Sequence, residues 1–222
     1  MRVPQVILVL YAIAAIANVI ANFMDWETVQ DYSKPLLMPL LLAFVYESSK
    51  GAVTILILLL SLSLILSWGG DVSLMYEGNN YFILGLTLFL LAHLSYTYLF
   101  LKSIDFKIRL RPIHVLPMVL YSAVFLSIIL PKSGPLTIPV TIYALVITIM
   151  ALGAMARFER TTRKSFNFVF IGSLIFVLSD SLLAYSKFSS SFTGDGALVM
   201  LTYVLAQYLI VDGVLSANAQ SR

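Results

Sequence analysis

The sequence predicts an all-α polytopic membrane protein with eight transmembrane helices. Of its 222 residues, 60% are hydrophobic and only 11% are charged, and the mean hydropathy is +0.95. A soluble domain carries about 25% charged residues. Long apolar runs separated by short polar loops extend over the whole chain, so we expect residues 1–222 to form a single integral membrane domain.

Eight runs approach the roughly 20 residues that a helix needs to cross a bilayer. They cover residues 3–23, 34–46, 52–76, 81–101, 112–130, 136–156, 166–186 and 197–217. The second run is short unless it begins in a turn at residues 31–33. The first run follows Arg2 and contains small residues, as a signal peptide does, but its length of about 20 apolar residues favours a retained helix.

The basic residues predict the orientation. With eight spans, eleven of the fourteen lysines and arginines fall on the side of the termini, and three fall on the other side. The first group is Arg2, Lys50, Lys102, Lys107, Arg109, Arg111, Arg157, Arg160, Arg163, Lys164 and Arg222; the second is Lys34, Lys132 and Lys187. The positive-inside rule then puts both termini in the cytoplasm of a multi-pass cell-membrane protein (the inner membrane, if the source is bacterial). The basic clusters are typical of loops at lipid headgroups, and no nucleic acid partner is expected.

Three short motifs recur in the same order in the two halves of the chain, which predicts an internal repeat. KPLLMP (34–39) resembles GPLTIP (134–139), GDVSL (70–74) resembles SDSLL (179–183), and FLLAH (89–93) resembles YVLAQ (203–207). Four helices per repeat would give two parallel halves, at about residues 1–105 and 106–222, related by an axis along the membrane normal.

Two aspartates lie in apolar surroundings. Asp71 follows the apolar run that ends near Trp68, and Asp180 recurs in a similar context. A carboxylate in hydrocarbon costs about 3 kcal/mol even on the lenient insertion scales, so such residues usually serve a function. If the repeat is real, the aspartates are symmetry mates, and we expect them to face each other near the axis as one site.

Further polar side chains share helix faces with small or aromatic residues, as in a lined cavity. Gly85, Phe89, His93 and Tyr96 follow one face, and Tyr203 and Gln207 another. The candidates to bind or position a substrate are Lys34, His93, Tyr96, Tyr143, Tyr203 and Gln207. A helix interface with interhelical hydrogen bonds would look similar, and a lysine at the end of a span often only reaches to the headgroups.

Two carboxylates in a dry site do not ionise independently, and such a pair tends to share one proton. One member is then an acid and the other a base. This arrangement suits acid-catalysed cleavage through an oxocarbenium-like state, and equally a proton-coupled transporter. The chain has no cysteine and only two histidines, so we expect no metal site. Acid-catalysed cleavage by a pair of carboxyl groups also requires no cofactor.

The motifs at residues 34–39 and 70–74, the helix with Gly85, His93 and Tyr96, and the motifs around Asp180 and Gln207 together resemble the YhhN-type family, whose eukaryotic members include lysoplasmalogenase. The resemblance implies hydrolysis of the sn-1 vinyl ether bond of a lysoplasmalogen. The products are a fatty aldehyde and glycerophosphocholine or glycerophosphoethanolamine.

On this resemblance, Asp71 and Asp180 divide the roles of general acid and general base. Lys34 binds the lipid phosphate, and His93, Tyr143 and Gln207 position water or the glycerol hydroxyl. The implied partners are a lysophospholipid substrate and the lipid bilayer; the sequence does not specify an oligomeric state.

Two other functions fit the same residues. One is a small proton-coupled transporter or flippase for a lipid-like substrate, which the repeat and the prolines at 35, 39, 135 and 139 would suit. The other is a lipid-binding membrane protein without catalysis. Release of free aldehyde in detergent separates the hydrolase from both.

Overall fold

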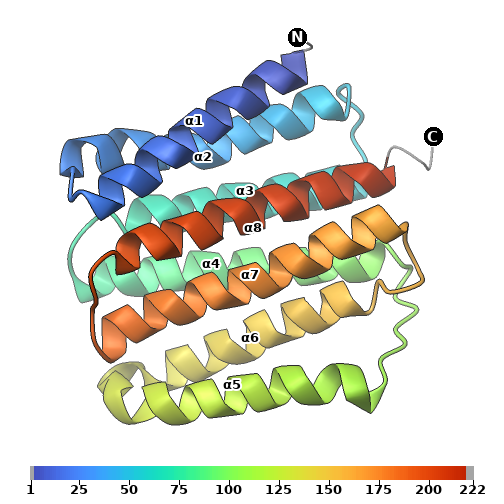
Figure 1. The fold of residues 1–222 in the computed structure, drawn as a ribbon. Coiled ribbons are helices and arrows are strands. Elements are labelled where there is room, and N and C mark those ends of the chain that lie inside the picture. Colours follow the sequence, from blue (N-terminus) through green and yellow to red (C-terminus); the bar gives the residue numbers. More distant parts are fainter. Residues whose placement is uncertain (1–2, 219–222) are drawn as a thin grey trace.

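A computed structural model describes residues 3–218, and within this range the chain forms eight α-helices and one short 3₁₀ turn (Figure 1). The helices are α1 (Val3–Phe23), α2 (Glu27–Ser48), α3 (Ile55–Ser73), α4 (Asn79–Lys102), α5 (Pro112–Ser133), α6 (Thr137–Met155), α7 (Arg163–Phe188) and α8 (Asp195–Asn218), and the turn η1 (Gly134–Leu136) joins α5 to α6. Arg2 and Arg222, which contribute to the predicted charge asymmetry, lie outside the described residues.

The helices run up and down beside one another (Figure 1). In this view α1 and α2 form one edge, α5 forms the opposite edge, and the pairs α3 and α8, then α4 and α7, lie between them. The start of α1 and the end of α8 lie at the same end of the molecule, together with the loops that precede α3, α5 and α7. Most of the basic loop residues therefore gather at one end.

Six helical stretches in the described part are long and apolar enough to cross a membrane, and one of them, Pro112–Met155, contains both α5 and α6. The chain is thus a multi-pass helical membrane protein. Helix α2 is not among the six, and it carries Glu27, Asp31, Lys34 and Glu47. It begins seven residues before the predicted run at 34–46, so the expected turn at residues 31–33 is wrong: these residues are helical.

Glycines allow the closest helix pairs to form. A Cβ on Gly70 of α3 would lie 2.6 Å from two ring atoms of Phe89 on α4. A Cβ on Gly172 of α7 would lie 3.0 Å from the carbonyl oxygen of Ala206 on α8. Small residues let helix backbones approach in this way. The two pairs α3–α4 and α7–α8 carry most of the predicted polar residues.

A hydrogen bond between α2 and α3 compensates for a proline. Pro39 has no backbone N–H, so the carbonyl of Pro35, four residues earlier, lacks its helical donor. The indole Nε1 of Trp68 donates to this carbonyl at 3.0 Å. The bond fastens α2 to α3 three residues before Asp71.

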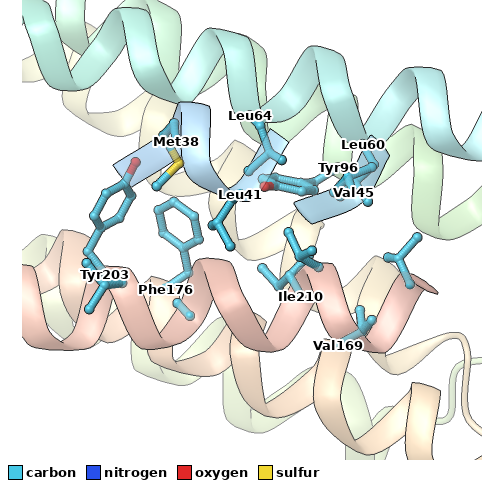
Figure 2. Packing of buried hydrophobic residues seen from close by; sticks show 14 of the residues in the cluster. Met38, Leu41, Val45, Leu60, Leu64, Tyr96, Val169, Phe176, Tyr203 and Ile210 are labelled. Carbon is cyan, nitrogen blue, oxygen red and sulfur yellow. The ribbon is translucent and has the colours of Figure 1, made fainter. Parts of the chain in front are cut away.

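The interior between α2, α3, α4, α7 and α8 is mainly apolar. Figure 2 shows how the side chains from α2 and α3 meet those of α7 and α8 in this region. Tyr96 and Tyr203 belong to the same buried cluster, so hydroxyl groups enter the core where the aspartates lie.

Arg157 lies in the predicted basic loop between α6 and α7, but its side chain is fully buried instead of reaching the lipid headgroups. Its Nη2 donates to Ser165 Oγ at 2.7 Å, and its guanidinium lies 5.7 Å from the centre of the Phe100 ring. Burial lowers the pKa of Arg157 from its usual value to about 10, so the guanidinium stays charged at neutral pH. The residue anchors the turn between α6 and α7, at the end of the bundle away from the aspartates.

Candidate active site

Asp180 is the centre of one hydrogen-bonded cluster formed by α4, α6 and α7. Tyr143 of α6 donates its hydroxyl to Asp180 Oδ2 at 2.5 Å. His93 of α4 places Nε2 3.0 Å from the same oxygen and 2.9 Å from the Tyr143 hydroxyl. Two groups, from α4 and α6, thus converge on one carboxylate oxygen of α7.

The surroundings of the His93 ring indicate which of its two nitrogens carries a proton. The imidazole is fully buried, and no described protein atom partners its Nδ1. A buried N–H without an acceptor is costly, whereas an unpaired lone pair costs less. We therefore assign the proton to Nε2, which donates to Asp180, and treat the ring as neutral. Oδ2 of Asp180 then accepts two hydrogen bonds, one from His93 and one from Tyr143.

Asp71 is the centre of a second cluster, formed by α3, α4 and α8. The Tyr203 hydroxyl donates to Asp71 Oδ2 at 2.7 Å. Gln207, one turn further along α8, donates from Nε2 to Ser67 Oγ at 3.0 Å and accepts from the Tyr96 hydroxyl at 2.5 Å. Gln207 Nε2 also lies 3.4 Å from the Tyr203 hydroxyl, so the cluster is continuous.

Aromatic rings stand between the two clusters. Phe176 makes edge-to-face contacts with His93 and Tyr203, with ring centres 4.8 and 5.6 Å apart. Phe89 also meets Tyr203 edge to face, at 5.9 Å. Among the described residues no hydrogen bond joins Asp71 to Asp180. The two aspartates therefore belong to separate hydrogen-bonded clusters, and the expectation that they share one proton as a single site stays a prediction.

Lys34 lies on α2, half-buried, on the Asp71 side of the bundle. Its charge acts favourably on Asp71 through space, in opposition to the effect of Asp180. No described hydrogen bond or ion pair of 4.0 Å or less involves its ammonium group. The structure thus brings Lys34 near one aspartate without a direct contact.

Cavities distinguish the two aspartates. Two cavities of about 50 Å³ share a wall made of Val140, Tyr143, Asp180 and Ala184. The Asp180 side chain retains 13% of its exposure, whereas Asp71 retains 2% and lines neither cavity. Asp180 is therefore the carboxylate that a small molecule can reach.

Some residues of the site could not be singled out in the sequence. Ser67 accepts from Gln207, and its only sequence signal is its position one turn before Asp71 on α3. Phe176 lies four residues before Asp180 in the sequence, so the two share a helix face. The sequence does not indicate that the Phe176 ring lies between the two clusters. In the described part of the chain, no group of three or more histidine, cysteine, aspartate or glutamate residues could hold a metal ion.

Comparison with known proteins gives relatives for most of the chain. Lysoplasmalogenase TMEM86A of Bos taurus is 30% identical over 157 residues, which are 66% of this chain and 61% of the relative. Human lysoplasmalogenase TMEM86B is 30% identical over 153 residues, which are 68% of this chain and 61% of the relative. The chain thus spans about 61% of the length of these curated relatives. No solved structure matches.

The family model of the YhhN family matches residues 29–214. The match begins at the start of α2, ends within α8, and includes both aspartate clusters. Since it covers far more than half of the sequence, the chain belongs to the YhhN family.

Proposed function

We propose that the protein is an intramembrane hydrolase that cleaves the sn-1 vinyl ether bond of lysoplasmalogens. The products would be a fatty aldehyde and a glycerophosphocholine or glycerophosphoethanolamine. Membership of the family and relatives named lysoplasmalogenase support this reaction. The observation that carries it is the Asp180 carboxylate, held by two donors at the wall shared by two cavities.

The reaction needs an acid that protonates the β-carbon of the vinyl ether and a base that accepts a proton from the attacking water. The protonated Asp180 carboxyl gives its proton to the β-carbon of the vinyl ether, and the π electron pair forms the new C–H bond. Water adds to the resulting oxocarbenium carbon and returns a proton to the Asp180 carboxylate. The hemiacetal then collapses to aldehyde and glycerol hydroxyl, so that one water is consumed and Asp180 is restored.

The neighbours of Asp180 suit this cycle. Both described hydrogen bonds end on Oδ2, which leaves Oδ1 to carry the transferred proton. Hydrogen bonds from Tyr143 and His93 stabilise the carboxylate that remains after proton transfer, when the oxocarbenium ion needs a counter-charge.

We assign Asp71 a supporting role. The sequence interpretation divided acid and base between the two aspartates, but Asp71 lines neither cavity at Asp180 and is bound by Tyr203. In our proposal Asp71, Tyr203, Gln207 and Tyr96 fix the α3–α4–α8 side of the site. Lys34 then offsets the Asp71 charge instead of binding phosphate.

We also propose that all eight helices cross the cell membrane, with both termini in the cytoplasm, and that the two halves are a parallel repeat. A crossed arrangement supports the repeat: Asp71 of the first half binds Tyr203 of the second, and Asp180 of the second half binds His93 of the first. Phe89 and Tyr203, which occupy matching positions of the two motifs, touch each other, as residues at a two-fold axis would.

The test is aldehyde release by purified protein in detergent. Lysoplasmenylcholine and lysoplasmenylethanolamine are the substrates, and the saturated-ether lysolipid, which has no double bond to protonate, is the control. We expect aldehyde from the vinyl ethers only. Asp180→Asn should abolish turnover, whereas Asp71→Asn should reduce it and leave it measurable.

Each other result has a definite meaning. Equal abolition by both variants would favour two carboxylates with separate acid and base roles. Turnover that persists in Asp180→Asn would refute the mechanism. Absence of aldehyde from folded wild-type protein would refute the hydrolase, and proton flux in liposomes would then test transport.

A further inference from the structure

A cavity of about 470 Å³ lies along α5, α6 and α7. Volumes of about 300–1,000 Å³ are typical of small-molecule sites. Its wall is apolar almost throughout, with residues such as Met118 of α5, Ala151 of α6 and Leu174 of α7. We call this cavity the α5 groove.

The α5 groove leads to Asp180. Tyr121, Ser122 and Val177 line both the groove and the neighbouring cavity, and Asp180 and Tyr143 line the far side of that cavity. From Phe170 to Ala184 this row of cavities follows fifteen residues of α7, which rise by about 21 Å along the helix. Each leaflet supplies about half of the 30 Å hydrocarbon core, or about 15 Å. A row of cavities of this length therefore has room for a single lipid chain.

Helix α5, which forms the outer wall, is packed more loosely than the other helices. Of its 22 residues only Ile129 and Ser133 are buried. Two hydroxyl bridges fasten it near the junction of the cavities: Ser122 to Thr148 of α6 at 2.6 Å, and Tyr121 to Ser181 of α7 at 2.9 Å. A lipid chain can therefore enter from the membrane at the side of α5.

The opposite side of Asp180 differs in character. The second small cavity ends at Phe82 and Phe188, whose rings meet edge to face. Lys187 places its ammonium 4.9 Å from the centre of the Phe82 ring. A cation at this mouth suits an anionic group, whereas the α5 groove suits hydrocarbon.

From these observations we propose that the α5 groove binds the single hydrocarbon chain of the lysolipid, with the ether end at Asp180, the chain end near His114, and the phosphate end directed to Lys187. The proposal rests on the proposed function for the identity of the lipid. The groove itself requires only that a single-chain ether lipid binds.

The first experiment locates the chain. A saturated-ether lysolipid with a diazirine at the chain end, which the proposed reaction cannot cleave, is photolysed with purified protein, and the modified peptides are mapped. We expect labels on residues 113–118 of α5 and 170–178 of α7. Labels near Phe82 and Phe188 would mean the opposite orientation, and labels elsewhere would mean another site; either would overturn the proposal.

The second experiment blocks the groove. Leu174→Trp fills it from a position that is 41% exposed, so the fold should tolerate the larger ring. Ile171→Trp is the matched control, because Ile171 lies on the same helix, is 48% exposed and does not line the groove. Leu178→Trp, at another half-exposed groove position, is a second blocking variant.

Each buried methylene changes binding about fourfold, so loss of a few methylene sites should raise KM at least tenfold. We expect both groove variants to raise KM for an 18-carbon vinyl ether at least tenfold, while an 8-carbon substrate and the Ile171→Trp protein are unaffected. Equal behaviour of all three folded variants would overturn the proposal.

The design separates the two proposals. If wild-type protein releases no aldehyde from any vinyl ether, the proposed function fails, and photolabelling alone decides the groove. Labels in the groove that Leu174→Trp removes and Ile171→Trp retains would then support a lipid-chain site without hydrolysis. Aldehyde release with labels outside the groove would leave the function standing and reject the groove.

Discussion

Asp180 receives its two hydrogen bonds from different helices, so its position depends on how α4, α6 and α7 pack. The sequence already indicated Asp180, His93 and Tyr143 as polar residues in apolar runs. The sequence placed them in one candidate site but did not indicate that His93 and Tyr143 both bond to Asp180 Oδ2, because helical spacing gives the face of each helix but not the rotation of one helix against another. The same limit explains why the sequence did not show that Asp71 and Asp180 belong to separate hydrogen-bonded clusters.

Tyr143→Phe tests the hydroxyl that donates to Asp180. A hydrogen bond to a charged group contributes about 1.5–3 kcal/mol, so we expect kcat for vinyl ether cleavage to fall roughly tenfold to a hundredfold, with KM little changed. Tyr98→Phe is the control, because Tyr98 is half-exposed on α4 and has no described hydrogen bond. A Tyr143→Phe protein with wild-type kcat would exclude a role of this hydroxyl in proton transfer.

Trp68→Phe tests the bond that compensates for Pro39. Loss of the donor leaves the Pro35 carbonyl unpaired and should lower the free energy of unfolding by about 1 kcal/mol. In a Pro39→Ala background the restored N–H supplies that carbonyl, so the same change should cost less. Thermal unfolding of the four proteins in detergent measures the coupling. An equal cost in both backgrounds would contradict the assigned reason for the bond.

At the scale of helices, the pairs α3–α4 and α7–α8 carry most of the two clusters. Their existence was predictable, since each apolar run is close to the length of a span, and the helix bounds agree with the runs within a few residues for all helices except α2. That helix begins among Glu27, Asp31 and Ser33, whose polarity hid it from a search for apolar runs. Packing against α1, where Asn18 donates to Ser33 at 2.9 Å, stabilises this polar part as a helix.

Gly70→Ala and Gly69→Ala form a matched pair on α3. The new Cβ at 70 would meet ring atoms of Phe89 at 2.6 Å, whereas at 69 it would meet the flexible end of Leu88 at 3.2 Å. Overpacking of this kind typically costs 1–3 kcal/mol. We expect Gly70→Ala to lower the melting temperature and the activity together, and Gly69→Ala to be nearly neutral. Thermal unfolding and aldehyde release measure the two effects, and equal stability of the variants would contradict the close approach at Gly70.

For the whole molecule, the start of α1, the end of α8 and most basic loop residues lie together, at the end opposite the loops that follow Asp71 and Asp180 (Figure 1). The positive-inside rule predicts that the first end is cytoplasmic, and in the topology that we propose the aspartates lie in the outer half of the membrane. The alternation of loops made this arrangement predictable from the charges alone. The groove along α5 was not predictable, because it depends on how loosely one helix packs.

Cysteine labelling tests this topology. The chain has no cysteine, so a single one introduced at Lys107 or Thr193, both exposed in loops, is unique. We expect an impermeant maleimide to label Thr193→Cys on intact cells, and Lys107→Cys only after the membrane is opened. Labelling of Lys107→Cys but not Thr193→Cys on intact cells would mean the opposite orientation. Labelling of both would contradict the odd number of crossings, by α5, α6 and α7, between the two positions.

The hydrogen bond of Trp68 gives the molecule an optical signal of its own. The protein has two tryptophans, and Trp26→Phe would leave Trp68 as the single indole, three residues before Asp71 and bonded to the proline-containing part of α2. The emission of an indole shifts with its hydrogen bonding and with nearby charge. The fluorescence of such a protein should therefore report, without any attached dye, when α2 moves against α3 or when a lipid reaches the aspartates.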